Sequence, residues 1–288
     1  MNNLAQDTLI DSLPASIAQK LERALSSLPS GETAKIEQPK ADGAFNHVLF
    51  ITTETARYVF RARREMSAAE LKAYMRSMYE CTGFLIDGGA FKIRNIAEET
   101  EFIKRALAAD LPVPQLIQAE SDWMLIEYIE GKTLWSFLEA GKVEFLVKVL
   151  QAIISAHRQE IIYADRWGGN EMIDSSGKVR MIDFDIEWFY DGANLTTLKS
   201  LEIAFIIFNS MRLTSKRDEL INLVESGIIP LLTKWEYDLK QIGKFIAGLA
   251  NFYLSPDKPS NEWSLSTELY AAMSQPAHRL VDIFNQAN

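Results

Sequence analysis

The sequence predicts an α+β chain in two lobes, with a small antiparallel sheet first and a mainly helical region after it. Strand-like runs occur between residues 36 and 130, whereas apolar residues after Gly131 mostly follow helical spacing. Apolar residues make up 48% and charged residues 24% of the 288 residues, as in ordinary globular proteins. We therefore divide the chain into a helical extension (1–35), an N-lobe (36–130) and a C-lobe (131–288).

The composition disfavours several classes of protein. Thirty basic against thirty-nine acidic residues give a net charge of −9, which disfavours binding to nucleic acid or to an anionic membrane. The single cysteine, Cys81, excludes an internal disulfide and a cysteine-rich zinc module. Neither a membrane-length apolar run nor a secretory signal is visible. We expect a cytoplasmic protein, and the sequence does not indicate its oligomeric state.

The first half of the chain contains the strand-like runs. Residues 3–28 have helical spacing interrupted at Pro14, which favours a packing helix without chemistry. Residues 47–51 and 57–61 are extended runs joined by a short polar turn, and this pattern predicts a hairpin. A helix is expected over 68–79, while the glycine-containing segment 81–94 is left unassigned.

An amphipathic helix is predicted over 97–109, ending before the prolines that follow Leu111. Strands are expected at 115–119 and 123–128. Beyond Gly131 the pattern is helical except for extended pieces between 161 and 186.

Three polar residues in that extended stretch are the strongest candidates for chemistry. Asp165, Asn170 and Asp183 lie on short loops flanked by apolar residues, and the turn at 175–177 returns the chain so that Asp183 lies beside Asn170. Two carboxylates and an amide oxygen suit Mg²⁺, which keeps several waters and shares substrate phosphates. Each residue taken alone could equally be a turn or cap residue. The sequence has no Walker, HExxH or GxSxG motif.

The pattern Asp165-x-x-x-x-Asn170 followed by Asp183-Phe184 resembles the catalytic and metal-binding loops of the protein-kinase-like superfamily. It is most similar to the aminoglycoside phosphotransferase branch, which includes choline, homoserine and fructosamine kinases. The resemblance implies a two-lobed kinase-like fold that uses ATP and Mg²⁺. It also implies that Asp165 accepts the proton of an acceptor hydroxyl, while Asn170 and Asp183 hold Mg²⁺.

The resemblance extends to the residues expected to bind the nucleotide. The segment 42–48 resembles a nucleotide-covering turn, which implicates Gly43 and Asn46. Arg61 stands where the family has a phosphate-binding lysine, and Arg63 on the same strand face could share that task. Glu99 is our choice for the ion-pair partner of Arg61, with Glu98 and Glu101 as the other candidates.

Residues 123–131 resemble the interlobe hinge of the family. Backbone groups around Glu127, Tyr128 and Ile129 are therefore expected to bind the adenine edge. His157 aligns with a family histidine, and we interpret it as a core residue. Arg166 could offset charge on the transferred phosphoryl group or lie on the surface. Trp167 and Trp188 are interpreted as packing more than as stacking residues, and the role of Asp185 stays open.

The resemblance implies transfer of the γ-phosphoryl group of ATP to a hydroxyl of a small molecule. Arg61 and Tyr163, where the family usually has lysine and histidine, favour a catalytically silent nucleotide-binding protein instead. An atypical protein kinase is a further alternative, although no Ala-Pro-Glu triplet follows Asp183. Transfer of AMP is also left open, and the sequence does not identify the acceptor.

Overall fold

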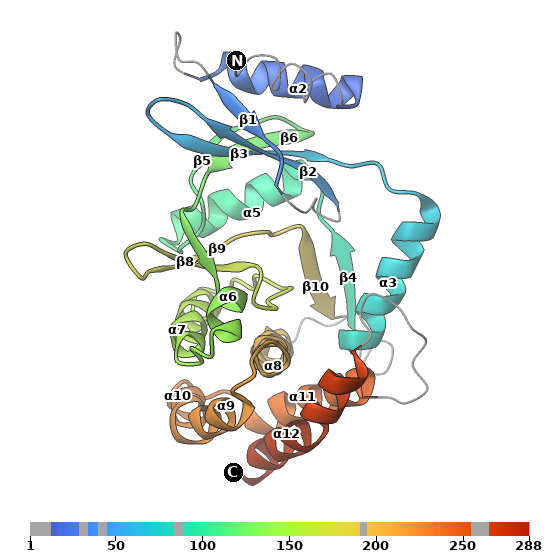
Figure 1. Ribbon diagram of the computed structural model, residues 1–288, viewed down its shortest axis with the longest axis vertical. Coiled ribbons are helices and arrows are strands. Elements are labelled where there is room, and N and C mark those ends of the chain that lie inside the picture. The colour runs from blue at the N-terminus through green and yellow to red at the C-terminus, as the bar shows by residue number, and fades with distance from the viewer. Residues whose placement is uncertain are drawn as a thin grey trace. The chain divides into compact units, whose positions relative to one another are not determined.

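The computed structural model describes residues 13–28, 34–39, 45–82, 89–190, 195–254 and 265–287. The chain forms two compact units (Figure 1). The sheet unit contains Met1–Ser67 and Ile93–Glu130, and the helical unit contains Ala68–Lys92 and Gly131–Asn288. The predicted α+β class, a small antiparallel sheet with a mainly helical part, is confirmed. The Gly43 prediction lies outside the described residues.

The sheet unit is built on a five-stranded antiparallel sheet in the order β1-β2-β3-β6-β5. Its strands are β1 (Lys35–Glu37), β2 (Asn46–Thr52), β3 (Arg57–Arg63), β5 (Leu116–Ala119) and β6 (Trp123–Glu127). The predicted hairpin is confirmed, with Val48 opposite Arg61, and Arg61 in turn pairs with Met124 of β6. Arg61 therefore lies on a central strand.

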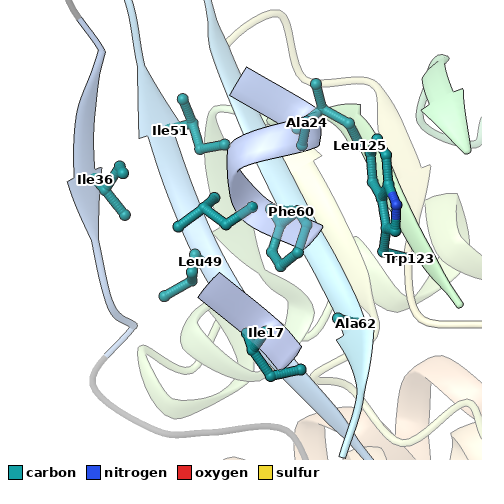
Figure 2. Packing of buried hydrophobic residues seen from close by; sticks show 10 residues of the cluster. Ile17, Ala24, Ile36, Leu49, Ile51, Phe60, Ala62, Trp123 and Leu125 are labelled. Carbon is teal, nitrogen blue, oxygen red and sulfur yellow. The ribbon is translucent and has the colours of Figure 1, made fainter. Parts of the chain in front are cut away.

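Helix α2 (Ala15–Ser26) covers one face of this sheet. The buried cluster beneath it joins apolar side chains of the helix to those of β1, β2, β3 and β6, as Figure 2 shows. Its members are Ile17, Leu21, Ala24, Ile36, Leu49, Ile51, Phe60, Ala62, Trp123 and Leu125. The predicted N-terminal helix is thus a packing element of the sheet unit from Ala15 onward.

Helix α5 (Ile96–Ala108) begins at a capping box. The Asn95 side chain accepts from the Glu98 N–H, and the Glu98 carboxylate accepts from the Asn95 N–H. This cap sets the helical phase, so that Glu99 is buried with Phe102 and Ile103.

The helical unit surrounds α8 (Leu195–Leu213), which is buried continuously from Ser200 to Met211. A helix that is apolar on every side belongs in a core. The other helices are α3 (Ala68–Thr82), α6 (Leu134–Glu139), α7 (Phe145–His157), α9 (Arg217–Leu223), the π-helix η1 (Val224–Ile228), α10 (Ile229–Lys234), α11 (Leu239–Tyr253) and α12 (Thr267–Gln286). Because α3 packs against α11, residues 68–92 group with the helical unit, whereas the sequence-based division placed them in the N-lobe.

Short strands complete the helical unit. β7 (Gly131–Thr133), β8 (Glu171–Asp174) and β9 (Val179–Met181) form an antiparallel sheet in the order β7-β8-β9. β10 (Ile186–Tyr190) pairs with β4 (Gly89–Ile93). The sequence did not predict β4, β7 or β10. In the described part of the chain, no helix is both long and apolar enough to cross a membrane.

Candidate active site

The loop between α7 and β8 has an unusual backbone. Ala164 and Asp165 have φ values of 58° and 41°, a left-handed conformation that L-residues rarely adopt. Gly168 has φ of 105°, and a Cβ there would lie 2.7 Å from Cδ1 of Leu213. The N–H of Trp135 donates to the Gly168 carbonyl at 2.8 Å. The surrounding structure therefore holds a strained turn directly at Asp165.

The loops carrying the three candidate residues are joined by hydrogen bonds within the helical unit. Nδ2 of Asn170 donates to the backbone oxygen of Asp165 at 3.0 Å and to its Oδ2 at 3.5 Å. The N–H of Ile182 donates to the Asn170 carbonyl at 3.0 Å. Because β8 and β9 form the predicted hairpin, Asp183 follows directly at its end. The proximity expected from the turn at 175–177 is confirmed.

Burial raises the pKa of Asp165 to about 6. The carboxylate of Asp183 also raises this pKa, whereas the Arg166 guanidinium and the Asn170 amide oppose the rise. Burial likewise raises the pKa of Glu171 to about 7, against the opposing effects of Arg166 and the Gly168 N–H. A carboxylate with a pKa close to neutrality is well suited to accept a proton during catalysis.

The donor atoms at this loop fit a magnesium ion shared with phosphates. Because Asn170 uses Nδ2 to bind Asp165, its Oδ1 is left as the ligand atom of the amide. The Asp183 carboxylate supplies a second oxygen donor. The described residues include no group of three or more His, Cys, Asp or Glu side chains able to hold a metal. Mg²⁺ commonly binds through one or two protein side chains and substrate phosphates, so the smaller set is sufficient.

Within the sheet unit, Arg61 and Glu99 form the expected ion pair. Nη1 of Arg61 lies 2.7 Å from Oε1 of Glu99, and their side chains are 7% and 0% exposed. The two other candidate partners are engaged elsewhere, since Glu98 caps α5 and Glu101 pairs with Lys104. Because both side chains are buried, removing either one would leave an unpaired buried charge, which is strongly unfavourable.

Arg63 does not share the position of Arg61. It donates to the backbone oxygens of Arg94 and Phe45, and so ties the end of β3 to neighbouring segments. Asn46, the other residue of the predicted nucleotide-covering turn within the described chain, is buried on β2 opposite Arg63. The contacts of the two arginines therefore favour Arg61 over Arg63 as the phosphate-binding cation.

Two of the three N–H groups of the predicted hinge are used inside the sheet unit. The N–H of Glu127 donates to Gln115 O at 2.9 Å, and the N–H of Tyr128 donates to Arg57 O at 3.2 Å. The Glu127 carboxylate accepts from the Gln115 N–H at 3.0 Å. In the described chain no group accepts from the N–H of Ile129. Any adenine contact through a hinge N–H is therefore expected at Ile129.

The structure corrects the prediction for Arg166. Its side chain is not on the surface, because it is fully buried and bound to backbone carbonyls. The prediction for His157 as a core residue is confirmed. Its Nε2 lies 2.5 Å from the Glu202 carboxylate and its Nδ1 lies 2.6 Å from the Tyr237 hydroxyl.

The two tryptophans near the loop are packing residues. Trp188 is buried and packs edge-on against Phe205, with ring centroids 5.4 Å apart. Trp167 packs edge-on against Trp135 at 5.3 Å. The sequence reasoning missed Glu171, which is fully buried beside the loop. The alternation of side chains along β8 could have indicated its burial, because it places Glu171 on the same buried face as Ile173.

Comparison with known proteins shows limited similarity to kinases. No protein-family model matches the chain. A stretch covering 36% of the chain is 26% identical to the serine/threonine-protein kinase PrkC of Bacillus subtilis. A stretch covering 22% is 31% identical to the probable serine/threonine-protein kinase SCO3848 of Streptomyces coelicolor. These matches span 19% and 10% of the two relatives.

Two solved structures of Rio2 kinase from Chaetomium thermophilum also align with most of the chain. One covers 90% of it at 12% identity with a TM-score of 0.49, and the other, an ADP/Mg²⁺-phosphoaspartate complex, covers 94% at 11% identity with a TM-score of 0.44. The alignments include 75% of each Rio2 chain. A protein-kinase-like fold stays a prediction for this chain. Assignment of the chain to the aminoglycoside phosphotransferase branch likewise stays a prediction.

Proposed function

We propose that this chain is an ATP- and Mg²⁺-dependent phosphotransferase that moves the γ-phosphoryl group to a hydroxyl of a small molecule. The observation that carries the proposal is the hydrogen bonding of Asn170 to Asp165, together with the bond from the Ile182 N–H to the Asn170 carbonyl, which brings the neighbouring Asp183 to the same loop. This arrangement supports the proposal because a carboxylate with a pKa near 6 lies beside two side chains with oxygen donors of the kind that Mg²⁺ prefers.

In this proposal Asp165 orients the acceptor hydroxyl and takes its proton as the oxygen attacks the γ-phosphorus. The bond from that phosphorus to the bridging oxygen breaks, and ADP leaves. Asn170 Oδ1 and the Asp183 carboxylate would hold Mg²⁺, which when bound neutralises charge on the nucleotide phosphates.

The sheet unit supplies the nucleotide-binding groups in the same proposal. The Arg61 guanidinium, held by Glu99, binds a phosphate oxygen, and its planar fork offers more than one donor. Gly43 and Asn46 are included among the phosphate-binding residues on the strength of the family resemblance. The N–H of Ile129 and neighbouring hinge carbonyls bind the adenine edge.

A protein hydroxyl is the second candidate acceptor. It is favoured by the curated relatives, which are serine/threonine-protein kinases. The small-molecule acceptor is supported by the resemblance of the Asp165–Asp185 segment to aminoglycoside phosphotransferases. The two candidates share the same catalytic residues and differ in the group that is phosphorylated.

The test is transfer of radiolabel from ATP by the full chain with Mg²⁺. ATP labelled at the γ- or the α-phosphate would be offered with amino alcohols, sugars and aminoglycosides, and separately with generic protein substrates. We expect γ-label on a small molecule, its loss in Asp165→Asn and its retention in Asp174→Asn, a matched change in the nearby hairpin. Label on protein only would favour the second candidate. Transfer of α-label, or ATP binding without Asp165-dependent transfer, would overturn the proposal.

A further inference from the structure

Arg166 is bound almost entirely to the backbone of the candidate site. Its Nε donates to the carbonyl of Ala164, and its Nη1 donates to the carbonyls of Asn170 at 3.0 Å and Ile182 at 2.9 Å. Its Nη2 donates to the carbonyl of Asp183 at 2.5 Å. The side chain has no exposed surface. One guanidinium therefore links both loops that carry the proposed catalytic and metal-binding residues.

Two of these four carbonyls belong to residues whose backbone conformation is unfavourable by itself. Ala164, Asp165 and Asp183 all have left-handed φ values, 58°, 41° and 61°. Such conformations persist only where the surroundings compensate for them. Arg166 binds the carbonyls of Ala164 and Asp183 directly, so its donors act at the strained positions.

The Arg166 guanidinium has a buried carboxyl group beside it. Oε1 of Glu171 lies 3.5 Å from Nη1 of Arg166, and both side chains are completely buried. Oε2 of Glu171 accepts from the Gly168 N–H at 2.6 Å. The guanidinium also lies near the rings of Tyr163 and Phe184, at 5.9 and 5.6 Å from their centroids. A buried arginine with this many partners has a defined position and orientation.

We propose that Arg166, with the buried Glu171 carboxyl beside it, is the positioning residue that sets the relative geometry of Asp165, Asn170 and Asp183. The inference deepens the proposed function and rests on it. Arginine is required because its planar fork presents separate donors in several directions, whereas a lysine ammonium offers its donors from a single atom. A displacement of reacting groups by about 1 Å can lower a rate by about a hundredfold.

The first measurement is hydrogen exchange of the full-length protein, which does not depend on activity. Arg166→Lys keeps the charge and removes the fork. Leu249→Ala is the matched control, because it truncates a buried side chain of α11 in the same unit. We expect at least tenfold faster exchange in residues 161–174 and 181–186 of Arg166→Lys, with α11 unchanged. In Leu249→Ala we expect faster exchange in α11 and unchanged exchange in residues 161–174 and 181–186.

The second measurement separates positioning from stability through kinetics, at a temperature where every variant is folded. Arg166→Lys should lower kcat at least tenfold and raise the half-saturating Mg²⁺ concentration several-fold, while Leu249→Ala retains both values. Glu171→Gln, which keeps an acceptor for the Gly168 N–H, should change them in the same direction but less. Added guanidinium should restore part of the kcat of Arg166→Gly, and tetramethylammonium should not.

The two measurements distinguish two failures. If wild-type protein transfers no phosphoryl group, the proposed function is overturned. If loop exchange in Arg166→Lys equals that of wild type, or its kcat and Mg²⁺ dependence match those of Leu249→Ala, the role of Arg166 is overturned.

Discussion

Replacing Asp165 with asparagine is expected to abolish phosphoryl transfer and, at the same time, to make the metal-free protein more stable near neutral pH. Asparagine cannot accept the hydroxyl proton, but its side-chain oxygen can still accept from Nδ2 of Asn170. The ionised carboxylate of Asp165 is unfavourable in the folded chain, as its raised pKa indicates. Stability and activity should therefore change in opposite directions.

The expected gain in the free energy of unfolding follows from the pKa of Asp165. Burial raises the pKa of Asp165 from its usual 3.8 to about 6, and one pKa unit corresponds to about 1.4 kcal/mol. The full shift would amount to about 3 kcal/mol. Because the side chain is only half-buried, we expect a gain of about 1–3 kcal/mol.

The effect of Asp165→Asn on the free energy of unfolding depends on pH. Between pH 3.8 and about 6 the folded state keeps the Asp165 proton while the unfolded state loses it. The folded chain then binds more protons, so the contribution of Asp165 to the free energy of unfolding falls as pH rises. The stability gain of Asp165→Asn should be absent below pH 3.8, grow through this range and level off above about pH 6.

The assay is urea unfolding of both proteins in EDTA across this pH range. Asp174→Asn is a control of opposite sign, because hydrogen bonds from Ser176 and Lys178 lower the pKa of Asp174. Its carboxylate stabilises the folded state above its unfolded pKa, so its loss should destabilise the protein at neutral pH. A pH-independent difference between Asp165→Asn and wild type, or a loss of stability at pH 7, would refute the reasoning.

Three further predictions concern activity and stability. The kcat/KM of the wild-type enzyme should rise with pH and level off above about 6, because Asp165 must be ionised to accept a proton. Glu99→Leu should cost about 3–5 kcal/mol in urea unfolding by leaving Arg61 charged and buried, and adding Arg61→Met should recover much of that loss. Gly131→Ala should cost about 1–3 kcal/mol in the same assay, because its Cβ would lie 2.3 Å from the Ile173 carbonyl oxygen.

Each of these has a clear contrary result. A kcat/KM independent of pH between 5 and 7 would argue against Asp165 as the proton acceptor. Additive effects of the changes at Glu99 and Arg61 would mean that the pair contributes no coupling energy. Wild-type stability of Gly131→Ala would show that β7 can move away from β8 at no cost.

Features governed by local sequence were predicted well. The β2–β3 hairpin follows from two alternating runs and a short turn, and α5 follows from its apolar spacing. The family resemblance implied an ion-pair partner for Arg61 on this helix, and the helical spacing selected Glu99, since residues one turn apart share a face. The loop with Asp165 and Asn170 was found because polar residues stand there between apolar runs.

Features that depend on distant pairing were missed. β4 pairs with β10 and β7 with β8, across long stretches of sequence, and each of these strands is too short to show a pattern of its own. The burial of Arg166 has a similar cause. Its acceptors are four backbone carbonyls from two loops, two of them at the left-handed residues Ala164 and Asp183, and neither this backbone conformation nor the convergence of the loops is visible in the sequence.

The packing of α2 on the sheet has a practical consequence for work on this chain. Removing the residues before β1 would uncover Leu49, Ile51 and Phe60, all nearly inaccessible in the intact unit. A truncated chain starting at β1 would expose an apolar surface that promotes self-association. Expression designs should therefore keep the segment from Leu13 onward, even though it supplies none of the proposed catalytic groups.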